Sequence, residues 1–216
     1  RLQNSDEELE KLRANNQEYR ASYKKIASRI SELRRDGATK LARQINTQLE
    51  LLGMPHASLE VTLRPVTSDD PVIHGLETVE FLVSTNPGQD AKPLIKIASG
   101  GELSRISLAI QVITAQTSQT PSLVFDEVDV GIGGGVARTV GELLRQLGSS
   151  TQILCVTHQA QVAGQGHQHL FVTKINSANS TVTKIEELTD AAKIREVARM
   201  LGGEEVSVES LAHAEQ

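Results

Sequence analysis

The chain has 216 residues, which is enough for one sizeable domain and an appendage, and it carries a net charge of −5. Residues 1–50 carry a charge of +3 and the remainder −8, which argues against a broad nucleic-acid-binding face on the acidic remainder. Three Phe, two Tyr and no Trp also argue against a base-stacking surface. The single cysteine excludes a disulfide framework and favours the cytosol, and no stretch is apolar enough to span a membrane.

The first part of the chain has the pattern of a coiled-coil helix over residues 5–36. Apolar or aromatic residues recur there at intervals of three, four or seven: Leu9, Leu12, Tyr19, Tyr23, Ile26, Ile30 and Leu33. Gly37 is predicted to interrupt this helix, and a second helix over 38–52 is predicted to end at Gly53. Because one strand of a coiled coil needs a partner, we expect that strand from another chain or from a portion outside this sequence.

After residue 55 the pattern changes to short strands that alternate with helices, which predicts an α/β fold. The predicted strands cover 57–65, 78–85, 93–98, 122–127 and 151–158, with a closing pair over 169–175 and 180–188. The predicted helices run from 99 to about 118, from 135 to 147 and from 189 to 201. We therefore expect a coiled-coil stub with a connecting helix over 1–53, and a lobe with a mostly parallel sheet and flanking helices over 54–216.

The stretch "IASGGELSR" starts a predicted helix with two glycines, although glycine is a poor helix former. Ser99 and Glu102 have the spacing of a capping box, which accounts for them but not for the glycines between them. The alternative is that Gly100 and Gly101 leave backbone amides open to an anion at the helix N-terminus. Taken alone, the stretch leaves both interpretations open.

Two consecutive carboxylates follow the apolar strand "SLVF". Because side chains alternate along a strand, Asp126 and Glu127 point in different directions and can act differently. One can hold a magnesium ion, directly or through water, while the other polarises a water molecule for attack on a phosphate. The simpler interpretation is a solvated acidic turn.

The order strand, helix, strand over residues 122–158 predicts a β-α-β unit with parallel strands. Parallel strands end at one edge of a sheet, so His158 is expected at the same edge as the acidic pair. A helix running antiparallel to strand 122–127 brings its N-terminus to that edge as well. Although a lone histidine is more often structural, this convergence predicts a phosphate site.

Two glycine patterns limit what kind of site this is. The run "GIGGGV" at 131–136 lacks the third glycine of a dinucleotide fingerprint and is interpreted as a flexible loop. The sequence contains no G-x-x-x-x-G-K-[ST] motif, so it has no phosphate cradle of its own. Together with the unpaired coiled-coil strand, this deficit predicts that an N-terminal portion supplies the rest of the site.

As a set, these motifs resemble those of a known family. "ASGGE", "LVFDE" and "VTH" are similar, in this order, to the signature motif, Walker B and H-loop of the C-terminal half of an ABC-type ATPase head. A coiled-coil strand entering that half is typical of the structural-maintenance-of-chromosomes (SMC) group. Within it, "KIASGGELSRISLAIQ", "FDEVDVGIGG", "CVTHQAQVA" and "ARMLGG" resemble the bacterial RecN family of DNA double-strand-break repair, from about residue 38 onwards.

The resemblance implies an ATPase that uses ATP and Mg²⁺ at a head-to-head dimer interface and couples hydrolysis to holding or bridging DNA ends. Asp126 would act on the magnesium ion, Glu127 would orient the attacking water, and His158 would reach the γ-phosphate. ATP bound to a second head would be contacted by the signature residues Ser99, Gly100, Gly101 and Glu102.

The resemblance also implies an N-terminal lobe with the Walker A motif, a second coiled-coil strand and DNA as partners, and no membrane. It places the protein in the bacterial cytoplasm at the nucleoid, and the chain alone is expected to be inactive. Family relatives usually carry Leu-Asp in the loop where this chain has Ile132 and Gly133, a change that RecN-like chains share. The role of that aspartate is therefore not transferred to Asp129.

Two other classes of function remain as alternatives. The first is a non-catalytic coiled-coil adaptor whose phosphate-binding edge captures a phosphorylated partner. The second is a small-molecule enzyme on a doubly wound sheet, which the missing glycine fingerprint and the lone coiled-coil strand argue against.

Overall fold

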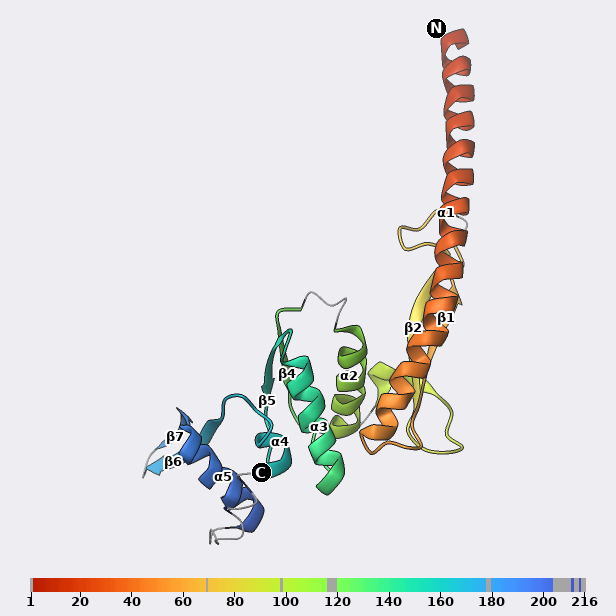
Figure 1. The fold of residues 1–216 in the computed structure, drawn as a ribbon. Coiled ribbons are helices and arrows are strands. Elements are labelled where there is room, and N and C mark those ends of the chain that lie inside the picture. The colour runs from red at the N-terminus through yellow and green to blue at the C-terminus, as the bar shows by residue number, and fades with distance from the viewer. Residues whose placement is uncertain are drawn as a thin grey trace. The chain divides into compact units, whose positions relative to one another are not determined.

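The computed structural model describes residues 2–68, 70–97, 99–115, 120–177 and 180–203, together with residues 211 and 214. Its contacts group the chain into two compact units, one of residues 1–46 with 56–96 and one of 47–55 with 97–216 (Figure 1). The α/β fold class is confirmed, with a long N-terminal helix. The two-domain division after residue 53 stays a prediction, and the strands that follow it belong to the first compact unit.

The N-terminal region forms one helix, α1 (Leu2–Leu51), so the prediction of two helices separated at Gly37 is wrong. Gly37 is exposed, and a Cβ there would have no heavy atom within 4 Å. An exposed glycine costs a helix only about 1 kcal/mol, which good helix formers on both sides outweigh. The predicted helix end at Gly53 is confirmed. Gly53 has a φ of 73°, and the amide of the next residue, Met54, donates to the Leu49 carbonyl.

The predicted coiled-coil seam of α1 is exposed along most of its length. Leu12 is 62% exposed, Tyr19 71% and Leu33 56%, and Leu9, Ile26 and Ile30 are exposed as well. Tyr23 differs, because its hydroxyl donates to the Val72 carbonyl and accepts from the Val72 amide, both at 3.1 Å. The prediction that Tyr23 belongs to the seam is therefore wrong.

The connection between the first two strands runs along α1 and is tied to it by polar side chains. Arg20 pairs with Asp70 at 2.6 Å, and Arg34 donates to the His74 carbonyl at 2.8 Å. Ser31, which is buried, donates to the Glu77 carboxylate at 2.7 Å. The face of α1 that carries Arg20, Ser31 and Arg34 is thus covered by the connection between β1 and β2. The seam residues stay exposed.

We expect Tyr23→Phe to loosen this connection. Removing the hydroxyl leaves the Val72 amide and carbonyl without that partner, which should lower the free energy of unfolding by about 1–2 kcal/mol. Urea unfolding of the chain measures this, with Tyr19→Phe as the matched control because Tyr19 is 71% exposed. An unchanged midpoint in Tyr23→Phe would contradict the tether.

The first unit also contains a small antiparallel sheet of β1 (Ser58–Pro65), β2 (Glu77–Ser84) and β3 (Lys92–Pro93). The buried residues Leu59 and Val83 are paired in the register of β1 and β2. The third strand was predicted over 93–98, but it stops at Pro93 and continues as a 3-10 helix (Leu94–Lys96). Proline cannot donate to the ladder, which limits this strand to two residues.

The second unit contains the predicted β-α-β unit. Strand β4 (Ser122–Phe125), helix α3 (Gly134–Leu147) and strand β5 (Gln152–Cys155) follow one another, and the two strands pair in parallel. Both strands end earlier than predicted, at Phe125 and Cys155, and the polar residues that follow lie outside the ladder. Helix α2 (Gly100–Thr114) contacts α3, and its predicted end at about 118 falls outside the described residues.

The rest of this unit follows β5. The four-residue helix α4 (Ala160–Ala163), which was not predicted, contacts both α3 and α5 (Asp190–Gly202). Strands β6 (Leu170–Ser177) and β7 (Ser180–Glu187) form the predicted antiparallel pair. The core gathers buried side chains from α2, α3 and the strands, including Ile106, Leu108, Phe125, Val140 and Leu144. None of the helices in the described ranges is long and apolar enough to cross a membrane.

Candidate functional site

Helix α2 begins with the side-chain cap that its sequence predicts. Ser99 has extended backbone, and its Oγ accepts a hydrogen bond from the Glu102 amide at 3.4 Å. The Glu102 carboxylate lies in the first turn, where negative charge interacts favourably with the helix dipole. Ser99 and Gly100 are exposed, whereas Gly101 is buried. The open part of this N-terminus is therefore Ser99 and Gly100.

The two glycines allow α2 to approach the turn that follows β4. A Cβ on Gly100 would lie 2.0 Å from Oε2 of Glu127, so the glutamate carboxylate rests against this residue. A Cβ on Gly101 would lie 3.2 Å from the Val130 Cβ and 3.3 Å from the Glu127 carbonyl oxygen. Ser104 also joins the two segments, since its Oγ donates to the Asp126 carbonyl at 2.7 Å. A side chain at position 100 would therefore displace the Glu127 carboxylate, and one at position 101 would press on the backbone of the turn.

A buried arginine fixes the same turn from inside α2. Arg105 is 8% exposed, and its Nη1 donates to the Val130 carbonyl at 2.8 Å. Burial lowers the pKa of the Arg105 guanidinium, and the Glu102 carboxylate opposes that shift. The helix N-terminus and the turn after β4 are therefore held together by side chains on both.

The two consecutive carboxylates lie on this turn, and both are exposed. Oδ1 of Asp126 accepts a hydrogen bond from the Glu127 amide at 2.9 Å. Glu127 has a φ of 59°, a left-handed conformation that a non-glycine residue adopts at a cost in free energy. This conformation separates the two side chains, and the Glu127 carboxylate turns toward Gly100.

A third carboxylate connects this turn to the end of β5. Asp129 is only 1% exposed, and its Oδ2 accepts hydrogen bonds from the Thr157 hydroxyl and from the His158 amide at 3.1 Å. The same oxygen lies 3.5 Å from Nδ1 of His158. No role was predicted for Asp129, because its spacing from the acidic pair does not reveal that it folds inward.

His158 is held on a second side by its neighbour. Nε2 of Gln159 lies 3.4 Å from Nε2 of His158 and donates to the Ile132 carbonyl at 3.0 Å. The imidazole itself is 67% exposed. The structure thus connects His158 to the segment after the acidic pair, and connects that segment to the N-terminus of α2.

The glycines of segment 131–135 have no close neighbours on the side where a side chain would lie. A Cβ on Gly131, Gly133, Gly134 or Gly135 would meet no heavy atom within 4 Å. Gly131 and Gly134 have positive φ, so they serve the turn itself. The described contacts therefore explain the path of this segment but not the number of its glycines.

Cys155 ends β5 close to these carboxylates, and we expect its thiol to be unreactive. Burial raises the pKa of Cys155 to about 12, and the charges of Asp129 and Asp126 act in the same direction. Because only the thiolate is nucleophilic, iodoacetamide at about pH 8 should alkylate the folded chain far more slowly than the urea-unfolded chain. Mass spectrometry follows the reaction, and equal rates in both states would contradict this environment.

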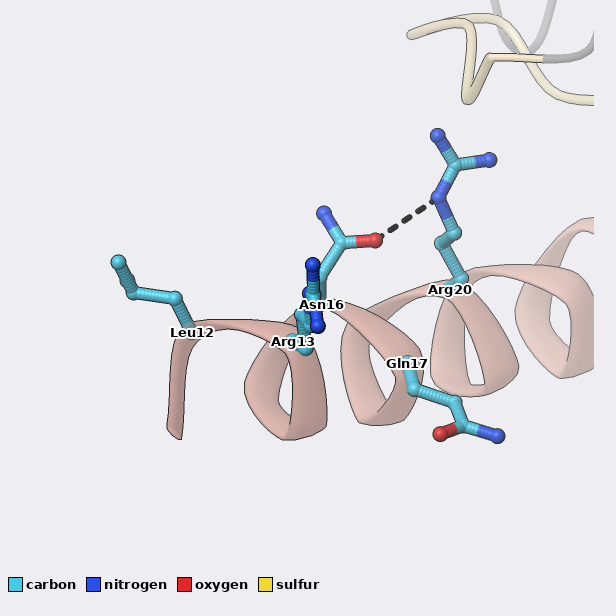
Figure 2. Close-up of a pocket in the computed structure, with 5 residues that line it drawn as sticks. All are labelled: Leu12, Arg13, Asn16, Gln17 and Arg20. Carbon is cyan, nitrogen blue, oxygen red and sulfur yellow. Dashed lines mark hydrogen bonds between the residues drawn. The ribbon is translucent and has the colours of Figure 1, made fainter. Parts of the chain in front are cut away.

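A groove on α1 has a different set of side chains from the candidate site. Leu12, Arg13, Asn16, Gln17 and Arg20 line it, and all come from one helix. Figure 2 shows the hydrogen bond in which Nε of Arg20 donates to Oδ1 of Asn16 at 3.0 Å. These five residues include no carboxylate and no nucleophile, so the groove is a polar helix surface.

The chain is similar in sequence to known proteins along most of its length. The chain is 45% identical over 212 residues to the DNA repair protein RecN of Vibrio cholerae, and 45% identical over 190 residues to that of Haemophilus influenzae. These matches cover 98% and 88% of the chain. The chain belongs to the RecN family. It spans 38% and 34% of the length of these two relatives, and a comparison with protein-family models finds no match.

A solved structure supports the fold assignment. The crystal structure of the Smc head domain with a coiled coil and joint from Pyrococcus yayanosii has a TM-score of 0.51 to this chain at 18% identity. The similarity covers 89% of the chain and 36% of the solved one. The fold of this RecN-family chain is therefore similar to that of part of an SMC head domain.

Proposed function

We propose that this RecN-family chain is the C-terminal half of an ATPase head that binds and hydrolyses ATP in DNA repair. The observation that carries the proposal is the connected cluster of the α2 N-terminus, the acidic pair and His158. Ser104 and Gly100 join α2 to the pair, and Asp129 joins the pair to His158. Such a cluster at the carboxyl ends of parallel strands is where α/β sheets bind phosphates.

Each residue has a separate proposed role. Glu127 orients the attacking water, and Asp126 acts on the magnesium ion. His158, whose ring is 67% exposed, contacts the γ-phosphate. Ser99, Gly100, Gly101 and Glu102 belong to the half-site that meets ATP bound to a second head, with the exposed Ser99 and Gly100 closest to it.

The donor set is consistent with Mg²⁺. The described residues contain no cluster of three His, Cys, Asp or Glu side chains, so they offer no all-protein metal cage. Magnesium characteristically takes one or two carboxylates and completes its octahedron with water and substrate phosphates. The exposed Asp126 carboxylate fits that description, and the ion would supply charge stabilisation at the transferred phosphate.

The proposal requires further protein, and two exposed apolar surfaces support it. Val124, Leu154 and Val156, on and just after the parallel strands, are 69%, 47% and 62% exposed. The α1 seam, from Leu9 to Leu33, is exposed too. We propose that a lobe with the Walker A motif covers the strands and that a second coiled-coil strand covers the seam. Two such heads would form a homodimer around ATP, and the coiled coil would couple hydrolysis to DNA.

ATP hydrolysis tests the proposal directly. The chain is assayed alone and after mixing with a separately produced lobe that carries Walker A, and association of the two is checked by gel filtration. We expect phosphate release from the mixture only. Associated lobes that release no phosphate would overturn the ATPase and favour a non-catalytic adaptor, and release by the chain alone would mean that the phosphate site has been misplaced.

A further inference from the structure

We propose that Asp129 is a positioning residue that fixes the tautomer and orientation of His158. Asp129 lies in the loop after the acidic pair, whereas His158 follows β5, so the contact crosses between the two parallel strands. The catalytic consequence of this contact rests on the proposed ATPase function, whereas the effect of Asp129 on the His158 imidazole does not.

The burial of Asp129 requires an explanation. A carboxylate that is 1% exposed must be hydrogen-bonded, because burial of an unpaired charge costs several kcal/mol or more. The partners found for its Oδ2 are the Thr157 hydroxyl, the His158 amide and, at 3.5 Å, Nδ1 of His158. All three belong to two consecutive residues: the two hydrogen bonds fix the backbone at this point, and Nδ1 of the ring lies within ion-pair distance of the same oxygen.

The ring contacts specify one tautomer. A carboxylate oxygen only accepts, so Nδ1 facing Asp129 carries the proton. The amide nitrogen of Gln159 only donates, so Nε2 of His158, 3.4 Å away, presents its lone pair. The orientation of the Gln159 amide is itself fixed, because the same nitrogen donates to the Ile132 carbonyl, which cannot donate in return. Both neighbours thus agree on the Nδ1–H form.

This arrangement determines what His158 can offer a nucleotide. With Nδ1 protonated and directed at Asp129, Nε2 is the ring atom available to a nucleotide: its lone pair faces the Gln159 amide here, and once protonated and turned from that amide it can donate to a phosphate oxygen. In both protonation states Nδ1 keeps its proton, so the carboxylate holds the ring in one orientation throughout. A contact of 3.5 Å in the absence of nucleotide is long, and such contacts tighten in the reacting complex.

Nitrogen NMR of the chain tests the tautomer without any activity. We expect the neutral form of the His158 ring, observed in the ¹⁵N-labelled chain at alkaline pH, to show a protonated Nδ1 and an unprotonated Nε2. The His158→Gln variant assigns the signals. In Asp129→Asn the Nδ1–H preference should be lost, whereas Thr157→Val, which keeps the carboxylate, should retain it.

Two results of this experiment would overturn the proposal. One is a neutral His158 ring in the wild-type chain that is protonated at Nε2. This result would overturn the proposed tautomer even if the Asp129→Asn variant does not fold. The other is an Asp129→Asn chain that is folded and has an unchanged His158 tautomer.

Steady-state kinetics of the reassembled head distinguish a positioning role of Asp129 toward His158 from a purely structural role. We expect Asp129→Asn to lower kcat about tenfold or more, while KM for ATP changes by less than about twofold. A loss of stability with an unchanged kcat would show that Asp129 only braces the fold. If the wild-type mixture hydrolyses no ATP, the proposed function fails, and the NMR result still decides the role of Asp129 toward His158.

Discussion

We expect that replacing Glu127 with glutamine strongly lowers ATP hydrolysis by the reassembled head, while ATP binding and dimerisation stay intact. Glutamine has the same shape and accommodates the same positive φ at no additional cost, so the turn after β4 keeps its conformation. What is lost is the negative charge that orients and polarises the attacking water. Groups of this kind contribute about 10²- to 10⁴-fold to a rate, so kcat should fall by at least about 10²-fold.

The measurement is phosphate release at saturating ATP, with nucleotide binding followed separately by equilibrium titration. Glu142→Gln is the matched control, because Glu142 is an exposed glutamate that pairs with Arg138 on the surface of α3. This variant should keep the wild-type rate. Normal turnover by Glu127→Gln would remove Glu127 from its proposed role.

A loss of stability is expected from Gly141→Ala, where α3 meets α4. A Cβ on Gly141 would lie 2.8 Å from the Gln165 Cγ, 3.0 Å from the Gln161 carbonyl oxygen and 3.2 Å from the Val162 Cα. Backbone atoms cannot move as cheaply as a side-chain end, so α4 has to shift away. Overpacking of this kind costs about 1–3 kcal/mol, while alanine returns about 1 kcal/mol of helix propensity.

We therefore expect a net loss of up to about 2 kcal/mol in the free energy of unfolding, measured with urea. Gly135→Ala, in the same helix, is the matched control because a Cβ there meets nothing within 4 Å. It should stabilise the chain slightly or leave it unchanged. A Gly141→Ala chain that is as stable as Gly135→Ala would show that α3 and α4 do not pack this closely.

Local patterns were enough to predict the elements that form the candidate site. Four-residue strands and a helix of regular periodicity carry their own signals, so the parallel β-α-β unit was confirmed with only its ends shortened. The helix cap at Ser99 was also predictable, because it depends only on Ser99 and the next three residues. Chain topology then places the acidic pair and His158 just beyond the ends of two neighbouring strands.

What could not be predicted depends on contacts between segments distant in sequence. Tyr23 fits a heptad seam by spacing, but its hydroxyl bonds to Val72, and spacing alone does not distinguish these two partners. Gly37 looks like a helix break because propensity is counted locally, whereas the helix is sustained by its length. Asp129 looks like one more exposed acid of the loop, and only the fold reveals that it turns inward to Thr157.

Mixing two inactive variants tests most directly whether the phosphate site is shared between two copies. Ser99→Arg and Glu127→Gln proteins, each reassembled with the Walker A lobe, are combined before ATP is added and assayed for phosphate release. In a mixed dimer both substitutions fall in one site and leave the other intact, so the mixture should regain about a quarter of the wild-type rate. A mixture as inactive as its two components, although mixed dimers form, would contradict a site completed by a second copy.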